Sequence, residues 1–134
     1  MQYMLDTDTC IYLIKRKPPG VLARFQRHKP GDAVISAITL AELEFGVEKS
    51  GAPQRNRSAL DALTELIPSM DFDSAAAAAY GRVRHHLEKA GRSIGSFDTL
   101  IAAHALSLSL ILVTNNERHF ARVSELNVEN WAKA

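Results

Sequence analysis

Four polar residues of this chain have the type and position expected of groups that do chemistry. Asp6 follows the short apolar run Tyr3–Leu5, and Asn116 follows another apolar run much later in the chain. Glu42 lies near the start of one predicted helix, and Asp98 opens another. Carboxylates that share a cavity repel one another unless a cation lies between them, and hard oxygen ligands suit Mg²⁺ or Mn²⁺. These residues predict an acidic metal site if the fold brings them together.

The elements that must position these residues are short strands alternating with helices. Strands are predicted at Tyr3–Leu5, Ala33–Ser36 and Leu110–Val113, with a short extended piece at Pro68–Phe72. Helices are predicted at about Thr9–Lys17, from Val21 onward, and at Thr39–Lys49, Arg55–Ile67, Asp73–Ala90, Ser96–Ser109 and Arg118–Val123, before an extended tail to Ala134. This alternation predicts an α/β fold with a mostly parallel central sheet flanked by helices. In such sheets ligands collect at the carboxyl ends of the strands, so Asp6 and Asn116 should meet at one edge.

Each acid also has a purely structural interpretation. Asp6 precedes a helix, where Asp is a common N-cap. Thr39 and Glu42 have the spacing of a capping box, with Thr39 as the cap. Asp98 can be a first-turn acid after a Ser96 cap, a position that the helix dipole favours. The individual patterns leave both interpretations open.

The position of Glu42 favours a functional role. It lies on the same helical row as Ile38 and Phe45, so it interrupts a row of apolar residues. A carboxylate among apolar side chains is costly unless it is paired or binds a metal ion. Glu44 lies about 200° around the helix from Glu42, and it is expected to face solvent or a partner.

The bulk properties of the chain narrow the class of protein. Its 134 residues predict one domain, residues 1–134, and a hydrophobic content of 46% is enough for an ordinary core. No signal peptide or membrane-spanning stretch is visible, so a cytoplasmic protein is expected. The net charge of +1 does not by itself predict nucleic-acid binding, although basic residues cluster locally.

Two other chemistries are disfavoured. There is no His-Glu-x-x-His motif or Cys-x-x-Cys pair, so zinc is not expected. The one cysteine, Cys10, has no persuasive catalytic histidine partner and is expected to be a small buried residue.

Four segments together resemble the VapC toxins, the PIN-domain ribonucleases of bacterial toxin–antitoxin pairs. They are Met4–Asp8, Ser36–Gly46, Ile94–Ala105, and Leu112–Asn116 followed by Arg118 and Phe120. The first three segments carry the family's three acids at Asp6, Glu42 and Asp98. The fourth segment places Asn116 at the fourth site. The resemblance extends from Met4 to Trp131, with the segments in the family's order.

This resemblance implies a PIN fold and a Mg²⁺-dependent endoribonuclease, with Mn²⁺ as a possible substitute. Asp6, Glu42, Asp98 and Asn116 are then the catalytic residues, and the three acids are the metal ligands. The resemblance also implies a VapB-like antitoxin as partner, an RNA substrate such as tRNA, and a homodimer.

Two departures from the family pattern affect the site. Many PIN domains have an acid where this chain has Asn116, which weakens a second metal position. Asp8 stands where many relatives have Asn, and its charge can compensate. Two alternatives remain open at this point: a PIN nuclease of RNA processing outside toxin systems, and a catalytically silent binding module that uses the acids as helix caps.

Overall fold

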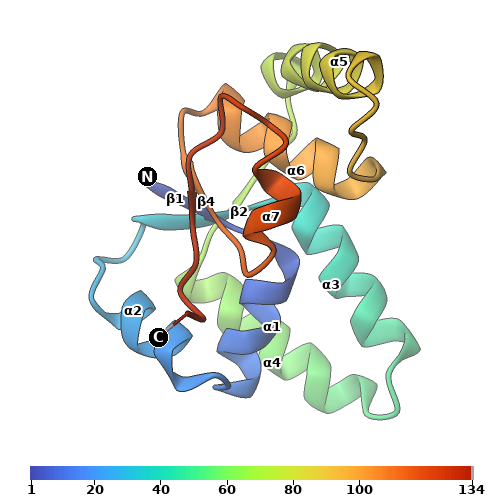
Figure 1. The fold of residues 1–134 in the computed structure, drawn as a ribbon. Helices are drawn as coiled ribbons and strands as arrows, with labels where there is room; N and C mark the ends of the chain where they lie inside the picture. Colours follow the sequence, from blue (N-terminus) through green and yellow to red (C-terminus); the bar gives the residue numbers. More distant parts are fainter. Residues whose placement is uncertain (134) are drawn as a thin grey trace.

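The computed structural model describes residues 1–133. Its elements, in chain order, are β1 (Tyr3–Leu5), α1 (Thr7–Lys15), α2 (Pro19–Gln26), β2 (Ala33–Ser36), α3 (Ala37–Lys49), α4 (Pro53–Leu66), β3 (Ser69–Met70), α5 (Ser74–Lys89), α6 (Ser96–Ser107), β4 (Ile111–Val113), α7 (Glu117–Phe120) and β5 (Val128–Glu129). The strands form one parallel sheet in the order β3-β2-β1-β4-β5, with helices on both sides (Figure 1). The predicted α/β class with a parallel sheet is confirmed.

Successive side chains of each inner strand enter opposite cores, as expected of a strand that is buried on both faces. In β1, Leu5 packs into the core beside α1 and α4, whereas Met4 packs into the core beside α5 and α6. In β2, Ile35 and Val34 divide in the same way. The sheet is therefore covered on both faces, and its polar groups concentrate at the strand ends.

The chain changes direction across the sheet between β1 and β4. It runs outward from β1 through β2 to β3, and then returns to place β4 on the other side of β1. Leu5 is in register with Val113, so these two strands end side by side. In parallel sheets the crevice beyond the carboxyl ends of such neighbouring strands is the usual ligand site. Asp6 and Thr114 are the first residues beyond these ends.

Several predicted helix starts were wrong by a few residues. The Thr39 cap is wrong, because α3 begins at Ala37 and the hydroxyl of Ser36 accepts from the Ile38 N–H at 3.0 Å. The Ser96 cap is also wrong, because Gly95 occupies the N-cap of α6 with φ of +96°, a conformation that glycine adopts without a Cβ clash. The predicted tail contains β5, and Ala134 lies outside the described residues.

Two bulk expectations can be compared with the structure. The thiol of Cys10 is fully buried, and burial raises its pKa far above the usual range, so the predicted structural role fits. Within residues 1–133, every helix is too short or too polar to cross a membrane.

A buried histidine joins three parts of the fold. His104 on α6 is 1% exposed, and its Nδ1 lies 2.7 Å from Oγ of Ser36. The same oxygen accepts from the Ile38 N–H, so Ser36 joins the start of α3 to the His104 ring on α6. Burial lowers the pKa of His104, an effect that the carboxylate of Asp73 and the Asp71 carbonyl oppose. The imidazole is neutral in the folded protein at neutral pH.

We expect His104→Leu to lower the free energy of unfolding by about 1–3 kcal/mol at pH 7.5, because the buried Ser36 hydroxyl loses its partner. The difference in the free energy of unfolding between the wild type and the variant should become smaller as the pH falls. The folded pKa of His104 lies below the ordinary 6.5, so the wild type loses stability from pH 6.5 downward, and the leucine variant has no such loss. Urea unfolding of both proteins at pH 7.5 and pH 5.5 checks this, and an equal deficit at both values would contradict it.

Candidate active site

Asp6 is buried at the carboxyl end of β1. It is 6% exposed and caps α1, with its Oδ1 accepting from the Thr9 N–H at 2.9 Å. Burial raises the pKa of this carboxyl, and hydrogen bonds from Thr114 and Thr9 only partly offset that effect. The expected capping role is confirmed. The raised pKa indicates that neighbouring groups do not fully stabilise the ionised carboxylate. A bound cation would stabilise it.

Glu42 is held at the same edge by a neighbour of Asp6. The hydroxyl of Thr7, the first residue of α1, donates to Oε1 of Glu42 at 2.6 Å. The carboxylate thus bonds to another element and does not close a capping box on its own helix. Glu42 does not interrupt a row of buried apolar side chains, as was predicted, because Phe45 is 64% exposed.

Glu44 belongs to a different contact. Its carboxylate forms a two-pronged ion pair with the guanidinium of Arg57 on α4, and this pairing lowers the pKa of Glu44. The side chain is 43% exposed, as expected of a residue that faces solvent. Glu44 therefore links α3 to α4 and does not extend the acidic edge.

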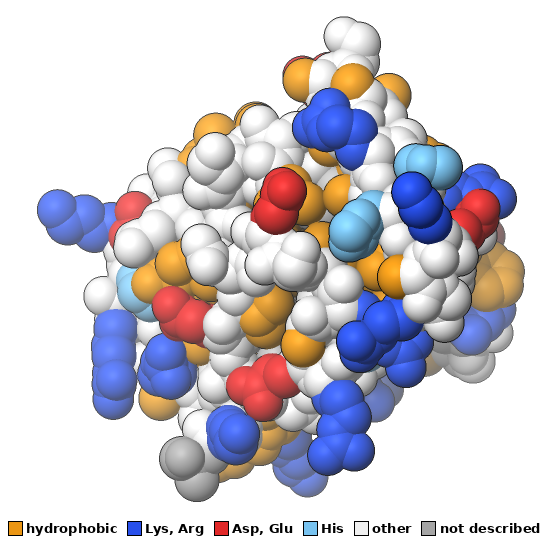
Figure 2. Space-filling model, turned by 45° about the horizontal axis from the view of Figure 1, so that its top comes forward, with side chains coloured by type: hydrophobic (Ala, Val, Ile, Leu, Met, Phe, Trp, Pro, Cys, Tyr) orange, Lys and Arg blue, Asp and Glu red, His pale blue; other side chains and the backbone are white. Residues whose placement is uncertain are grey.

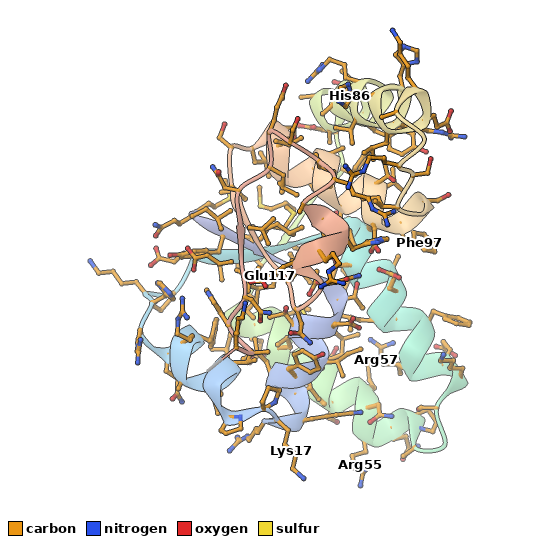
Figure 3. All side chains as sticks on the ribbon, in the orientation of Figure 1. Lys17, Arg55, Arg57, His86, Phe97 and Glu117 are labelled. Atoms are coloured by element: carbon orange, nitrogen blue, oxygen red, sulfur yellow. The ribbon has the colours of Figure 1, made fainter. Side chains whose placement is uncertain are left out.

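Asp98 lies in the first turn of α6 and pairs with a histidine from α7. Nε2 of His119 is 3.0 Å from Oδ2 of Asp98. Burial raises the pKa of Asp98, whereas His119 lowers it by its charge and hydrogen bond, and Asp8 raises it further. Figure 3 shows the preceding residue, Phe97, at the amino-terminal end of α6 near α3, and its side chain is 55% exposed.

The segment Asp6–Asp8 connects the predicted acids. Asp6 is itself one of them, and Thr7 holds Glu42. The negative charge of Asp8 raises the pKa of both Asp6 and Asp98, so Asp8 lies within electrostatic range of the two. The three residues after β1 are therefore one predicted acid, Asp6, a residue that bonds to Glu42 on α3, and a residue whose charge acts on Asp98 on α6.

The two asparagines after β4 have different roles. Asn115 is engaged, because its amide donates to Tyr12 at 3.2 Å and its carbonyl accepts from Asn130 at 3.0 Å. Asn116 is exposed and its side chain makes no capping bond to α7, although its backbone N–H donates to the Thr114 hydroxyl at 2.9 Å. The side-chain amide of Asn116 is thus exposed, whereas that of Asn115 is hydrogen-bonded to Tyr12 and Asn130.

The donor set can be tested for its fit to a divalent metal ion. Among residues 1–133, no group of three His, Cys, Asp or Glu side chains lies close enough together to hold a metal ion, and this includes the three predicted acids. Mg²⁺ usually keeps several waters and is held by one or two carboxylates together with substrate phosphates. Asp6 and Asp98 are oxygen donors whose negative charge is undercompensated, as their raised pKa values indicate. These residues fit a largely hydrated Mg²⁺ or Mn²⁺.

One cavity of the molecule is lined by none of the predicted acids. A cavity of about 280 Å³ lies between α5, α6 and the segment after α7, lined in part by Arg82, His86 and Val123 and by none of the predicted site residues. Figure 3 shows His86 on α5 at one end of the molecule, whereas Glu117 lies on α7 near its middle. Figure 2 shows Lys and Arg side chains spread along the margins of one face, with separate acidic side chains between them.

Sequence reasoning missed the polar residues that hold the acids. Thr114 is the first residue after β4 and Thr7 is the second after β1, and these positions at the strand ends could have identified them. His119 lies on α7, shortly after Asn116, and no neighbouring residue in the sequence indicates its contact with Asp98. The carboxyl ends of the strands therefore mark the threonines, and only the packing of α7 on α6 reveals the histidine.

Comparison with known proteins agrees with this arrangement. The family model for the PIN domain matches residues 3–126. The chain is 45% identical over 132 residues to the tRNA(fMet)-specific endonuclease VapC of Shigella flexneri, covering 98% of this chain and 99% of that protein. It is 44% identical over 131 residues to ribonuclease VapC2 of Haemophilus influenzae, covering 98% of each. The DNA-bound VapBC structure from Salmonella typhimurium matches with a TM-score of 0.92 at 40% identity, covering 98% of each chain. This chain therefore belongs to the PIN-domain family and, within it, to the VapC proteins.

Proposed function

We propose that this protein is the toxin of a type II toxin–antitoxin pair, a metal-dependent endoribonuclease that hydrolyses RNA phosphodiester bonds, and that residues 1–134 form a single PIN domain. The observation that carries the proposal is the segment Asp6–Asp8, which links the buried Asp6 to Glu42 through Thr7 and to Asp98 through the charge of Asp8. Membership of the VapC proteins supports the same activity.

Asp6, Asp98 and Glu42 are the residues that would hold Mg²⁺ or Mn²⁺. When bound, such an ion lowers the pKa of a coordinated water and offsets negative charge on the phosphate. The chain's own contribution is to keep the carboxylates in place. The Thr9 N–H orients Asp6, the Thr7 hydroxyl orients Glu42, and His119 contacts Asp98.

Glu42 and Asn116 complete the proposed chemistry. Glu42 accepts a hydrogen bond from Thr7, so its carboxylate has a second oxygen that can orient a water for attack. Asn116 has an exposed side-chain amide two residues after Thr114, and in this proposal it holds a further water. Because residue 116 is an amide and not an acid, it carries no charge. Asp8 supplies negative charge near both Asp6 and Asp98.

The relatives suggest a substrate and a partner. The Shigella flexneri protein is named as specific for tRNA(fMet), so we propose tRNA as the first substrate to test. Solved relatives such as VapBC from Salmonella typhimurium and VapBC2 from Rickettsia felis are complexes of toxin with antitoxin, at TM-scores of 0.92 and 0.90. We propose a VapB-like antitoxin as partner, a homodimer as the active assembly, and the cytoplasm as the place of action.

The two alternatives make different predictions about this protein. A PIN nuclease of RNA processing would cleave RNA but would need no antitoxin. A silent binding module would not cleave RNA at all. The contacts that hold Glu42 and Asp98 favour an active site over the silent module, because a helix cap requires neither Thr7 nor His119.

We expect expression of this chain alone to arrest growth, and co-expression of the product of a neighbouring small reading frame to relieve the arrest and yield a stable complex. The Asp6→Asn variant is the control, since it should be harmless while still binding the partner. Growth curves and affinity co-purification measure the two effects. If the chain cleaves RNA but neither arrests growth nor captures such a partner, the toxin assignment is wrong and the RNA-processing alternative replaces it.

A further inference from the structure

The short helix α7 and the residues that follow it hold the loop that leads into α6 through two side chains. Nε2 of His119 lies 2.6 Å from the carbonyl oxygen of Ile94, and Nη1 of Arg122 donates to the carbonyl of Ser93 at 2.9 Å. The next residue, Gly95, is the N-cap of α6. The position of α6 relative to α7 is thus set at the turn from which Asp98 projects.

His119 alone of these two residues also reaches the acid. Its Nε2 is 3.0 Å from Oδ2 of Asp98 as well as near the Ile94 carbonyl. Both neighbours are hydrogen-bond acceptors, so Nε2 must carry a proton that the two oxygens share. The ring packs edge-on against Phe120 at a centroid distance of 5.6 Å, and Phe120 is 1% exposed. One N–H on an anchored ring therefore fixes both the loop and one carboxylate oxygen.

We propose that His119 is a positioning residue for Asp98, holding its carboxylate in the orientation in which it binds a divalent cation. This inference rests on the proposed nuclease function for its catalytic consequence, but its effect on cation binding is independent of RNA. Carboxylates that bind metal ions are commonly oriented by a hydrogen-bond donor behind them, and loss of such a donor typically costs 10–100-fold in metal affinity or activity.

The structure offers a conservative variant and a matched control. The side-chain amide of Gln places an N–H near the position of the histidine Nε2, so His119→Gln keeps the donor without the ring or its charge. His119→Leu removes the donor. Arg122→Ala removes the neighbouring bond to Ser93 and leaves Asp98 untouched.

The experiment measures Mn²⁺ binding by electron paramagnetic resonance and tRNA cleavage with saturating Mn²⁺, on the full chain, after thermal melting shows that each variant is folded. We expect His119→Leu to lose about 10–100-fold in Mn²⁺ affinity and in kcat, with little change in KM. His119→Gln should recover most of the loss, and Arg122→Ala should lower only the melting temperature. If His119→Leu is unfolded at the assay temperature, His119→Asn, whose shorter side chain cannot reach both acceptors, takes its place.

Each other result decides against the proposal. Wild-type Mn²⁺ affinity and kcat in His119→Leu would show that Asp98 needs no donor, and failure of His119→Gln to recover would show that the N–H is not the property that matters. An equal loss in Arg122→Ala would assign the effect to the loop. If the wild type binds Mn²⁺ but cleaves no RNA, the proposed function fails, while the Mn²⁺ affinities still decide the role of His119.

Discussion

The Asp98→Asn variant should be as stable as the wild type or more stable in the absence of metal, and its RNA cleavage should fall by roughly two to three orders of magnitude. Asparagine has nearly the shape of aspartate and still accepts from His119, but it lacks the negative charge. A loss of charge that leaves the fold intact separates a role in catalysis from a role in the scaffold.

The direction of the stability change follows from the electrostatics of Asp98. Burial and the charge of Asp8 raise its pKa, and His119 only partly offsets them. An acid with a raised folded pKa contributes stability that is present below its ordinary pKa, near 3.8, and is lost as the pH rises through the folded value. At neutral pH the ionised carboxylate thus opposes folding, and Asp98→Asn removes that opposition. A first-turn acid in a purely structural role would instead contribute about 1 kcal/mol at most, which the variant would lose.

The measurement is a melting curve beside a time course of tRNA cleavage, with and without Mg²⁺. Asp61→Asn is the matched control, because it makes the same chemical change on a helix surface where the side chain is 63% exposed. The control should retain full activity. A destabilised but active Asp98→Asn protein would refute the metal-binding role of this residue.

Removal of divalent cations should abolish cleavage by the wild-type protein, and addition of Mg²⁺ or Mn²⁺ should restore it. Burial raises the pKa of Asp6 and of Asp98, and the negative charge of Asp8 raises both further, so a bound cation would stabilise the ionised carboxylates. Bound cation should also stabilise the fold. A ligand at a hundred times its Kd adds about 2.7 kcal/mol to the free energy of unfolding.

Cleavage is measured after exhaustive treatment with EDTA, and the melting temperature is measured over a Mn²⁺ titration. The wild type should melt at a higher temperature as Mn²⁺ is added, whereas Asp98→Asn should respond far less. Persistent cleavage in a clean, fully chelated preparation would rule out the metal mechanism, and equal Mn²⁺ stabilisation of both proteins would place the cation elsewhere.

Local sequence pattern was sufficient to predict the α/β class with a parallel sheet and the strand ends at one edge of the candidate site. The apolar runs at Tyr3–Leu5 and Ala33–Ser36 predicted β1 and β2 with the observed bounds. Strand character depends on side chains that are neighbours in the sequence, so it can be predicted locally. Because parallel strands end at a common edge, the positions of β1 and β4 were sufficient to predict that Asp6 lies near the residues after β4.

Patterns at helix starts were less informative, because several residues near each start can act as the cap. Thr39 fitted a capping box, but Ser36 is the cap, and its hydroxyl also serves His104 from α6. Phe45 was expected in an apolar row with Glu42, yet α3 turns Leu43 and Val47 into the core and leaves Phe45 exposed. Which face of a helix is buried depends on the element packed against it.

By itself, the sequence predicted the fold class and the carboxyl ends of β1, β2 and β4, because these depend on residue type and on spacing within one element. It also offered Asp6, Glu42 and Asp98 as the candidate acids, through their family resemblance. Only the tertiary structure decided that Thr7 holds Glu42, 35 residues away, and that His119 contacts Asp98 from another helix. The physical reason is that a hydrogen bond between side chains on separate elements requires a separation near 3 Å. That separation depends on how whole helices pack on the sheet. It cannot be predicted from any single segment of the chain.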